Sequence, residues 1–197
     1  NSGIDYMHNA QYYDNQSTRF IADGSVITED EYEVRQRNNY SFRLGIDYDI
    51  NKTTTAGFLA KGFMNFRDRE VENNAIANKL LPLSDSSSLV STKGYARFAS
   101  PSLNMYFKKV LDTTGKEITF NADYLRYLKK WNDDFTTDFY DGNKTKYRSA
   151  ELLRDFSPAD NEIKSISVDY VHPLKKNAKL EAGLKTIFSK TDNDVLW

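Results

Sequence analysis

The 197-residue sequence predicts an all-β fold in which antiparallel strands follow one another as an up-and-down meander. Three observations lead to this prediction: an aromatic-rich composition, long stretches in which apolar and polar residues alternate, and connections that are alternately short and long. The chain contains 13 Tyr and 12 Phe, and Gly, Asn, Asp, Ser and Thr fill the positions between its apolar residues. Aromatic side chains fit the pleated, half-buried surface of a sheet, so this composition favours strands over helices.

The clearest strand runs from residue 40 to residue 50. Its apolar side chains occupy every second position, at Tyr40, Phe42, Leu44, Ile46, Tyr48 and Ile50. A helix would distribute these side chains around its whole circumference, whereas a strand places all of them on one face. The period of two therefore predicts a strand.

Short turns divide the alternating segments into predicted hairpins. We expect these antiparallel pairs: 40–50 with 54–66, 103–111 with 117–127, and 165–171 with 179–189. A weaker alternation at 4–12 adds an N-terminal strand, so that six or seven strands are predicted. Because proline cannot donate a ladder hydrogen bond, we expect Pro101 at the outer end of its strand and Pro173 at the close of another.

Tight turns and long connections alternate strictly along the chain. In chain order they lie at 14–38, Asn51, 68–94, Thr113, 129–162 and Lys175. The first of them reads either as a charged loop or as a strand extension. Each strand of a meander reverses direction, so all tight turns are predicted at one end of the sheet and all long connections at the other. Transmembrane β-barrels have this asymmetry, with short periplasmic turns and long extracellular loops.

The two faces of the predicted strands have the chemistry of a wall between lipid and water. Phe42, Leu44 and Ile46 lie on one face between Tyr40 and Tyr48, whose amphipathic rings suit a membrane interface. The other face is polar, as a hydrated lumen would be, with Arg43, Asp47, Lys61, Asn65, Asn121, Asp123, Asp169, Glu181 and Lys185. These features predict a segment of a transmembrane β-barrel.

A soluble antiparallel β-sandwich that acts as a binding module, for example for glycans, is the alternative, because a half-buried soluble sheet shows the same alternation. The two folds differ in where their apolar side chains lie. In a sandwich, Phe42, Leu44, Ile46, Phe120 and Leu184 would meet in a closed core. In a barrel they would point outward in one band.

Composition excludes several other functions. The formal net charge is −1 and the basic residues form no stripe, so a nucleic-acid partner is not expected. The chain has no Cys, and therefore no thiolate zinc site, disulfide or cysteine nucleophile. It has no run of about 18 apolar residues that would make a membrane-spanning helix. That criterion does not detect barrel strands, because their apolar residues alternate with polar ones.

No catalytic residue, metal ligand or cofactor site is predicted. The two histidines, His8 and His172, lie far apart and have no acidic residues at matching spacing. An outer-membrane hydrolase is a third class, and the scarcity of His counts against it. We therefore expect that the protein is not an enzyme.

One segment is a candidate ligand-contact loop. Trp131, Asp134, Asp138 and Tyr140 lie in the polar, aperiodic stretch that follows residue 129. Their aromatic rings could stack on a sugar or another apolar ligand, and their carboxylates could hold a cation. The alternative is a solvated loop whose aromatic residues pack on neighbouring strands.

The hairpin sequences resemble an outer-membrane β-barrel family of Bacteroidota. The resemblance lies in YSFRLGIDYDINK at 40–52, DTTGKEITFNADY at 112–124, VDYVHPLKK at 168–176 and LEAGLK at 180–185. This family is similar to the barrel portion of TonB-dependent receptors. The resemblance implies location in the cell outer membrane and a role in the uptake or surface binding of an unknown ligand, and it supplies no catalytic residues.

The resemblance also implies how the chain is organised. Residues 1–197 are expected to form a single, partial barrel domain, with neither a plug domain nor a signal peptide in the sequence. The expected partners are the lipid bilayer, the remaining strands and plug of a parent chain, and the TonB system. Seven strands fall short of the roughly eight that the smallest bacterial barrels contain, which favours an internal segment of a larger barrel.

Overall fold

The computed structural model describes residues 1–22, 24–78, 86–174 and 178–194. All regular structure in these ranges is β-strand. The strands are β1 (Ser2–Phe20), β2 (Val26–Asn51), β3 (Thr54–Asn78), β4 (Ser86–Val110), β5 (Glu117–Tyr140), β6 (Glu151–Phe156), β7 (Ala159–Pro173) and β8 (Lys179–Asn193). The predicted all-β fold is confirmed.

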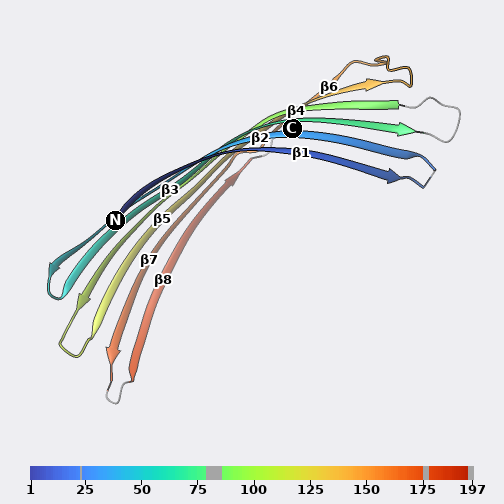
Figure 1. Cartoon of the computed structure of the whole chain (residues 1–197). Helices are drawn as coiled ribbons and strands as arrows, with labels where there is room; N and C mark the ends of the chain where they lie inside the picture. The colour runs from blue at the N-terminus through green and yellow to red at the C-terminus, as the bar shows by residue number, and fades with distance from the viewer. Residues whose placement is uncertain (23, 79–85, 175–177, 195–197) are drawn as a thin grey trace.

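The strands form one arched sheet in the order β1-β2-β3-β4-β5-β7-β8, with β6 also paired to β5 (Figure 1). Every pairing is antiparallel, and each strand of the path lies beside its neighbour in the chain except where β6 precedes β7. The predicted up-and-down meander is therefore confirmed. In the described ranges β1 and β8 do not pair with each other, so the sheet is open.

The three predicted hairpins are present. Residues 40–50 pair with 54–66 within β2 and β3, with Leu44 opposite Ala60. Residues 103–111 lie along β4 and its following turn, and Phe107 faces Phe120 on β5. The third hairpin joins β7 to β8, and β7 ends at Pro173 as expected.

The connections separate into two ends of the sheet, as predicted (Figure 1). The β2–β3 turn and the β4–β5 turn lie together at one end, where β7 also ends and β8 begins. The predicted turn residue Lys175 lies outside the described residues, as do residues 23 and 79–85 of the opposite connections. The β1–β2 and β5–β6 connections lie at the other end.

Both described tight turns use a side-chain oxygen to hold the backbone. In the β2–β3 turn, Asn51 Oδ1 accepts hydrogen bonds from the Thr53 amide at 3.0 Å and the Thr53 hydroxyl at 2.9 Å. In the β4–β5 turn, Asp112 Oδ1 accepts the same pair from Thr114 at 2.9 and 2.6 Å. Gly115 follows with a φ of 91°, a conformation that glycine adopts without strain. These local hydrogen bonds explain why short polar sequences end the strands here.

The Asp112 carboxylate in this turn is stabilised in its charged form. The Thr114 hydroxyl and then the Lys116 ammonium, 3.0 Å away, hold the pKa of Asp112 well below its usual range. The same contact raises the pKa of Lys116. The turn therefore carries a stable ion pair at neutral pH.

The stretches expected as long loops at 68–94 and 129–162 are mostly strand, which corrects the prediction. The β3–β4 ladder continues to Ala77 opposite Ser86, and β4–β5 continues to Ser87 opposite Tyr140. At 14–38 the strand-extension reading is the correct one, because β1 and β2 pair as far as Phe20 opposite Val26. The apolar–polar alternation disappears in these stretches while the backbone ladder continues.

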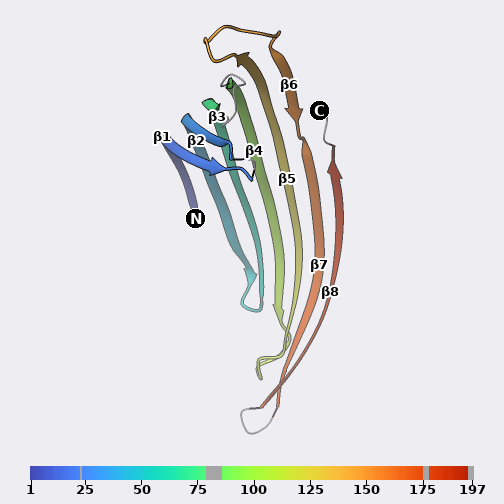
Figure 2. The ribbon, with the colours of Figure 1, turned by 90° about the vertical axis from the view of Figure 1, so that its right-hand side faces the viewer.

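Two prolines interrupt ladders without ending the sheet. Pro101 lies inside β4 and not at its end, which corrects the prediction. The β4–β5 ladder skips Ser100 and Pro101, because proline has no backbone N–H to donate to β5. Ser157 exchanges two backbone hydrogen bonds with Trp131, and Pro158 follows it. Figure 2 shows β6 and β7 in succession along the same edge of β5, so they are one strand interrupted at this proline.

The described residues form no closed apolar core. Only Val71 and Ala96 are buried among their hydrophobic residues. Phe42 is 41% exposed and Leu184 is 74% exposed, and both lie on a single-layer sheet. The soluble sandwich would require these side chains to meet, so the structure does not support it.

Candidate functional site

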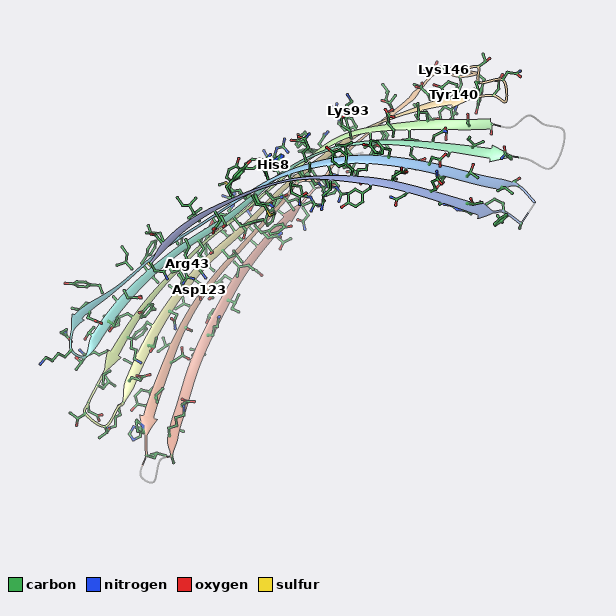
Figure 3. The ribbon with its side chains drawn as sticks, viewed as in Figure 1. His8, Arg43, Lys93, Asp123, Tyr140 and Lys146 are labelled. Atoms are coloured by element: carbon green, nitrogen blue, oxygen red, sulfur yellow. The ribbon has the colours of Figure 1, made fainter. Side chains whose placement is uncertain are left out.

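The cross-strand register sorts the side chains of the lower half of the sheet, nearest the tight turns, into two faces. We call the face that carries Leu44 the apolar face. We call a row of residues that lie directly opposite one another on successive strands a rung. One rung of this face runs from β2 to β8 through Ile46, Phe58, Met105, Ala122, Ile166 and Thr186. The opposite, polar face carries Arg43 and Asp123, which Figure 3 places in this same half of the sheet. The predicted apolar face is therefore continuous from β2 to β8. The polar face is mixed, because near the boundary it also carries Phe63, Phe98, Leu125 and Ile163.

We call the end of the sheet that carries the β1–β2 and β5–β6 connections the long end. Toward this end, the apolar face is bounded first by aromatic and then by charged side chains. Tyr40 packs against Tyr6 with ring centroids 5.0 Å apart and against Phe66 at 5.8 Å. Beyond them Arg97 pairs with Asp68 at 2.6 Å. An apolar band ended by aromatic rings is typical of barrel strands at a membrane interface.

This boundary crosses the strands obliquely. The last apolar residue of the face is Phe66 on β3 and Phe188 on β8, and their rungs meet β2 at Asn38 and Leu44 respectively. The shift of six residues is about 20 Å along a strand, over four interstrand steps of about 4.8 Å. A membrane plane that follows this boundary is inclined to the strands by about 45°, which matches the tilt of barrel strands.

The strands are much longer than a bilayer requires. A tilted barrel strand crosses with about 9–11 residues, whereas β2 has 26 residues and β5 has 24. The extra length lies beyond the charged boundary, toward the β1–β2 and β5–β6 connections. Polar and charged residues occupy both faces there, as is typical of barrel strands that extend beyond the bilayer.

The four residues of the predicted ligand-contact loop lie on β5 and not on a loop. Trp131 lies on the polar face, whereas Asp134, Asp138 and Tyr140 lie on the opposite face. Asp134 accepts a hydrogen bond from Arg154 at 2.5 Å, and Asp138 pairs with Lys146 at 2.8 Å. Tyr140 and Lys146 lie at the long end of the sheet (Figure 3). The structure therefore does not bring the four residues together.

Trp131 instead belongs to a cationic cluster on the polar face. We define the arginine cluster as the side chains on two neighbouring rungs together with Lys129. One rung contains Arg37, Arg67, Ala96 and Trp131, and the other contains Arg35, Arg69, Gly94 and Asp133. Arg37 is directly opposite Arg67, and Arg35 is directly opposite Arg69.

Small residues on β4 allow this cluster to form. Arg69 on β3 reaches across β4 to Asp133 on β5, with Nε 3.2 Å and Nη2 2.8 Å from the two carboxylate oxygens. A Cβ atom on Gly94 would lie 1.8 Å from Asp133 Oδ1, so only glycine leaves room for this contact. Ala96 is the equivalent small residue between Arg67 and Trp131.

Trp131 organises the centre of the cluster. Its indole Nε1 donates a hydrogen bond to Asp133 at 2.7 Å, which fixes the ring. The Arg67 guanidinium carbon lies 4.0 Å from the ring centroid, and Lys129 Nζ lies 5.1 Å from it. These distances are within the range of cation–π attraction.

The cluster has more cations than carboxylates. Arg35 is held by Glu33 through two hydrogen bonds of 2.9 and 2.7 Å, and Asp133 holds Arg69. Among the described residues Arg37, Arg67 and Lys129 have no carboxylate partner. The Nε–H groups of Arg37 and Arg67 are buried and donate no hydrogen bond to any other described residue. The cluster therefore has a positive excess and unused donors, which suit an oxyanion.

The sequence contains a signal for the arginine cluster in the spacing of its arginines about the first tight turn. Arg35 and Arg69 are equally far from Lys52, at the centre of the β2–β3 turn, and so are Arg37 and Arg67. Folding the predicted hairpin about this turn places like charges opposite each other. Asp133 lies in the same stretch as the predicted contact residues, but its partner Arg69 lies two strands away across Gly94, and local sequence does not reveal that contact.

Other functional groups are sparse. Over the described ranges no group of three His, Asp or Glu residues could hold a metal ion. His172 accepts or donates one hydrogen bond with Tyr170 at 3.0 Å, and His8 does so with Asn38 at 2.9 Å. No helix long and apolar enough to cross a membrane occurs in the part of the chain that the structure describes.

Comparison with known proteins finds a family match in the C-terminal part of the chain. A family model described as an outer membrane protein beta-barrel family matches residues 109–196, a little under half of the chain. This match places the protein in the outer membrane, in contact with the lipid bilayer. It agrees with the apolar face, whose boundary has the tilt of a barrel strand.

Other comparisons add little. None of the curated proteins compared with the chain matches it. The solved structure of the membrane pore complex of pneumolysin aligns with a TM-score of 0.13 and 8% identity. The alignment covers 100% of this chain and 31% of that one.

Proposed function

We propose that this chain forms part of the wall of an outer-membrane receptor or transporter of the TonB-dependent type, and that it is not an enzyme. Its ligand is taken up or bound at the cell surface. The apolar face contacts lipid, and the polar face lines the lumen. The observation that carries this proposal is the apolar face, which continues across the sheet and ends at the aromatic rings of Tyr40 and Phe66.

The open sheet supports the existence of partner strands. The outer edges of β1 and β8 have no strand beside them over the described residues. In a bilayer their backbone N–H and C=O groups must be paired, and a closed barrel achieves this pairing. We therefore propose that further strands of a parent chain complete the barrel and that a plug domain occupies it.

The proposed orientation places the tight turns in the periplasm and the protruding hairpins outside the cell. Cysteine labelling tests it, because this segment contains no Cys of its own. Asn143→Cys lies in the β5–β6 connection and Thr113→Cys in the β4–β5 turn, and both positions are exposed. In intact cells that express the parent protein, a membrane-impermeant maleimide should label the first variant only. Labelling of Thr113→Cys alone would reverse the orientation, and labelling of both would exclude a sealed barrel.

A plugged receptor also differs from an open channel in its permeability. The complete parent protein, reconstituted into lipid vesicles, should give no passive swelling in a solution of small sugars, because the plug closes the lumen. The matched control is the same protein without its plug domain, which should swell. Swelling by the complete protein would contradict the receptor type and favour an open channel.

A further inference from the structure

We infer that the arginine cluster binds the anionic group of the ligand, a phosphate or a carboxylate. This inference rests on the proposed function, because it takes the polar face as the lumen through which a ligand passes. Its geometric basis is two cross-strand pairs of arginines, Arg35 with Arg69 and Arg37 with Arg67, on adjacent rungs of one face.

Direct pairing of like charges is unfavourable in a sheet, and here it occurs twice in succession. Arg35 and Arg69 are each neutralised by a carboxylate, and those two carboxylates are largely buried at 7% and 4% exposure for Glu33 and Asp133. Arg37 and Arg67 lack such a partner in the described ranges. An oxyanion between these two side chains would remove the remaining repulsion.

The cluster is also preorganised for such a ligand. Arg67 is stacked over Trp131, and Trp131 is fixed by its hydrogen bond to Asp133. A guanidinium that is held in one plane loses less side-chain freedom when it binds an oxyanion through two parallel hydrogen bonds. Lys129 adds a third positive charge over the same ring.

The position of the cluster favours a soluble ligand over a membrane lipid. Arg37 and Arg67 lie on the face opposite Phe42 and Phe66, so the lipid contacts of the apolar face do not reach them. The cluster lies at the level where the strands leave the bilayer. A ligand that approaches from outside would meet these charges on entering the lumen.

The test is isothermal titration calorimetry on the complete parent protein in detergent, with inorganic phosphate, citrate and neutral glucose as separate probes. At least one of the two anions should bind, more weakly as the salt concentration rises, and glucose should not. The two anion arms distinguish phosphate from carboxylate recognition. In the double variant Arg37→Gln/Arg67→Gln, affinity for the bound anion should fall by about tenfold or more, as expected when charge-assisted hydrogen bonds are lost.

Lys130→Gln is the matched control. Lys130 lies next to Trp131 in sequence but on the opposite face, where it is opposite Arg97. This variant also removes a positive charge and should leave anion affinity unchanged. Lys130→Gln and the single variant Arg67→Gln each remove one positive charge, so an equal loss in the two would show that only the net charge matters and would overturn the site.

A second measurement separates a binding site from a structural cluster. If the site is empty in the ligand-free protein, Arg37→Gln/Arg67→Gln relieves repulsion and should raise the thermal unfolding temperature. If carboxylates from elsewhere in the parent already neutralise these arginines, the variant should lower that temperature and the wild type should bind neither anion. That result would overturn the inference, while the labelling of Asn143→Cys would still decide the orientation on which the proposed function depends.

Discussion

The half of the sheet near the tight turns and the half beyond the charged boundary share one continuous ladder and differ in their surroundings. In the first half, Leu44 and Ile46 alternate with Arg43 and Asp47. In the second half, both faces of β2 and β5 carry polar residues. The comparison teaches that apolar and polar residues alternate along a strand only where its two faces meet different surroundings. A strand whose two faces are both polar shows no such alternation.

The largest expected effect comes from placing a charge in each half in turn. Leu44→Arg introduces a cation at the middle of the apolar band and should destabilise the parent protein by about 2–4 kcal/mol. Val34→Arg is the matched variant, on the same face of the same strand but beyond the boundary, opposite Glu70. It should change the free energy of unfolding by less than about 0.5 kcal/mol. Unfolding by urea in lipid vesicles measures both, and equal effects would remove the distinction between the halves.

The next effect concerns the polar contacts that stabilise the half of the sheet beyond the charged boundary, which we call the protruding half. Gly94→Ala would place a methyl group against Asp133 and separate this carboxylate from Arg69. We expect a loss of about 1–3 kcal/mol, the usual cost of a buried polar group that loses its partner. Gly3→Ala is the control, because a Cβ there meets nothing within 4 Å. If urea unfolding gives the same result for both variants, specific polar contacts do not order this half.

The smallest effect lies at the tight-turn end. The pKa of Asp112 is lowered in the folded turn by Thr114 and Lys116, so this contribution to stability is fully present above the unfolded pKa near 3.8. It is lost as pH falls from there toward the lower, folded pKa. The Leu111 amide, which donates to the Lys116 carbonyl at 2.7 Å, reports on the turn. Its hydrogen-exchange protection, corrected for the intrinsic rate, should fall below about pH 4 in the wild type, and Asp112→Asn should show no such fall.

Sequence patterns were sufficient for the hairpins and insufficient for the cluster. The pairs that flank Asn51 and Thr113 follow from period-two alternation and from side chains that hydrogen-bond their own turns. The loop expected around Trp131 is a strand because its backbone pairs with β4 on one side and with β6 and Ser157 on the other. Neither partner can be recognised from the local sequence, since both are polar.

By itself, the sequence determined the strand class, the meander order and the apolar face, because these depend on residue spacing and on local turn chemistry. Only the tertiary structure decided that Asp133, and not Asp134, joins Trp131 and Arg69. The physical reason is that successive side chains of a strand point to opposite faces, while contacts on one face extend over two strands when a glycine such as Gly94 lies between them. A one-residue difference in position therefore separates an ion pair on one face from a cluster on the other.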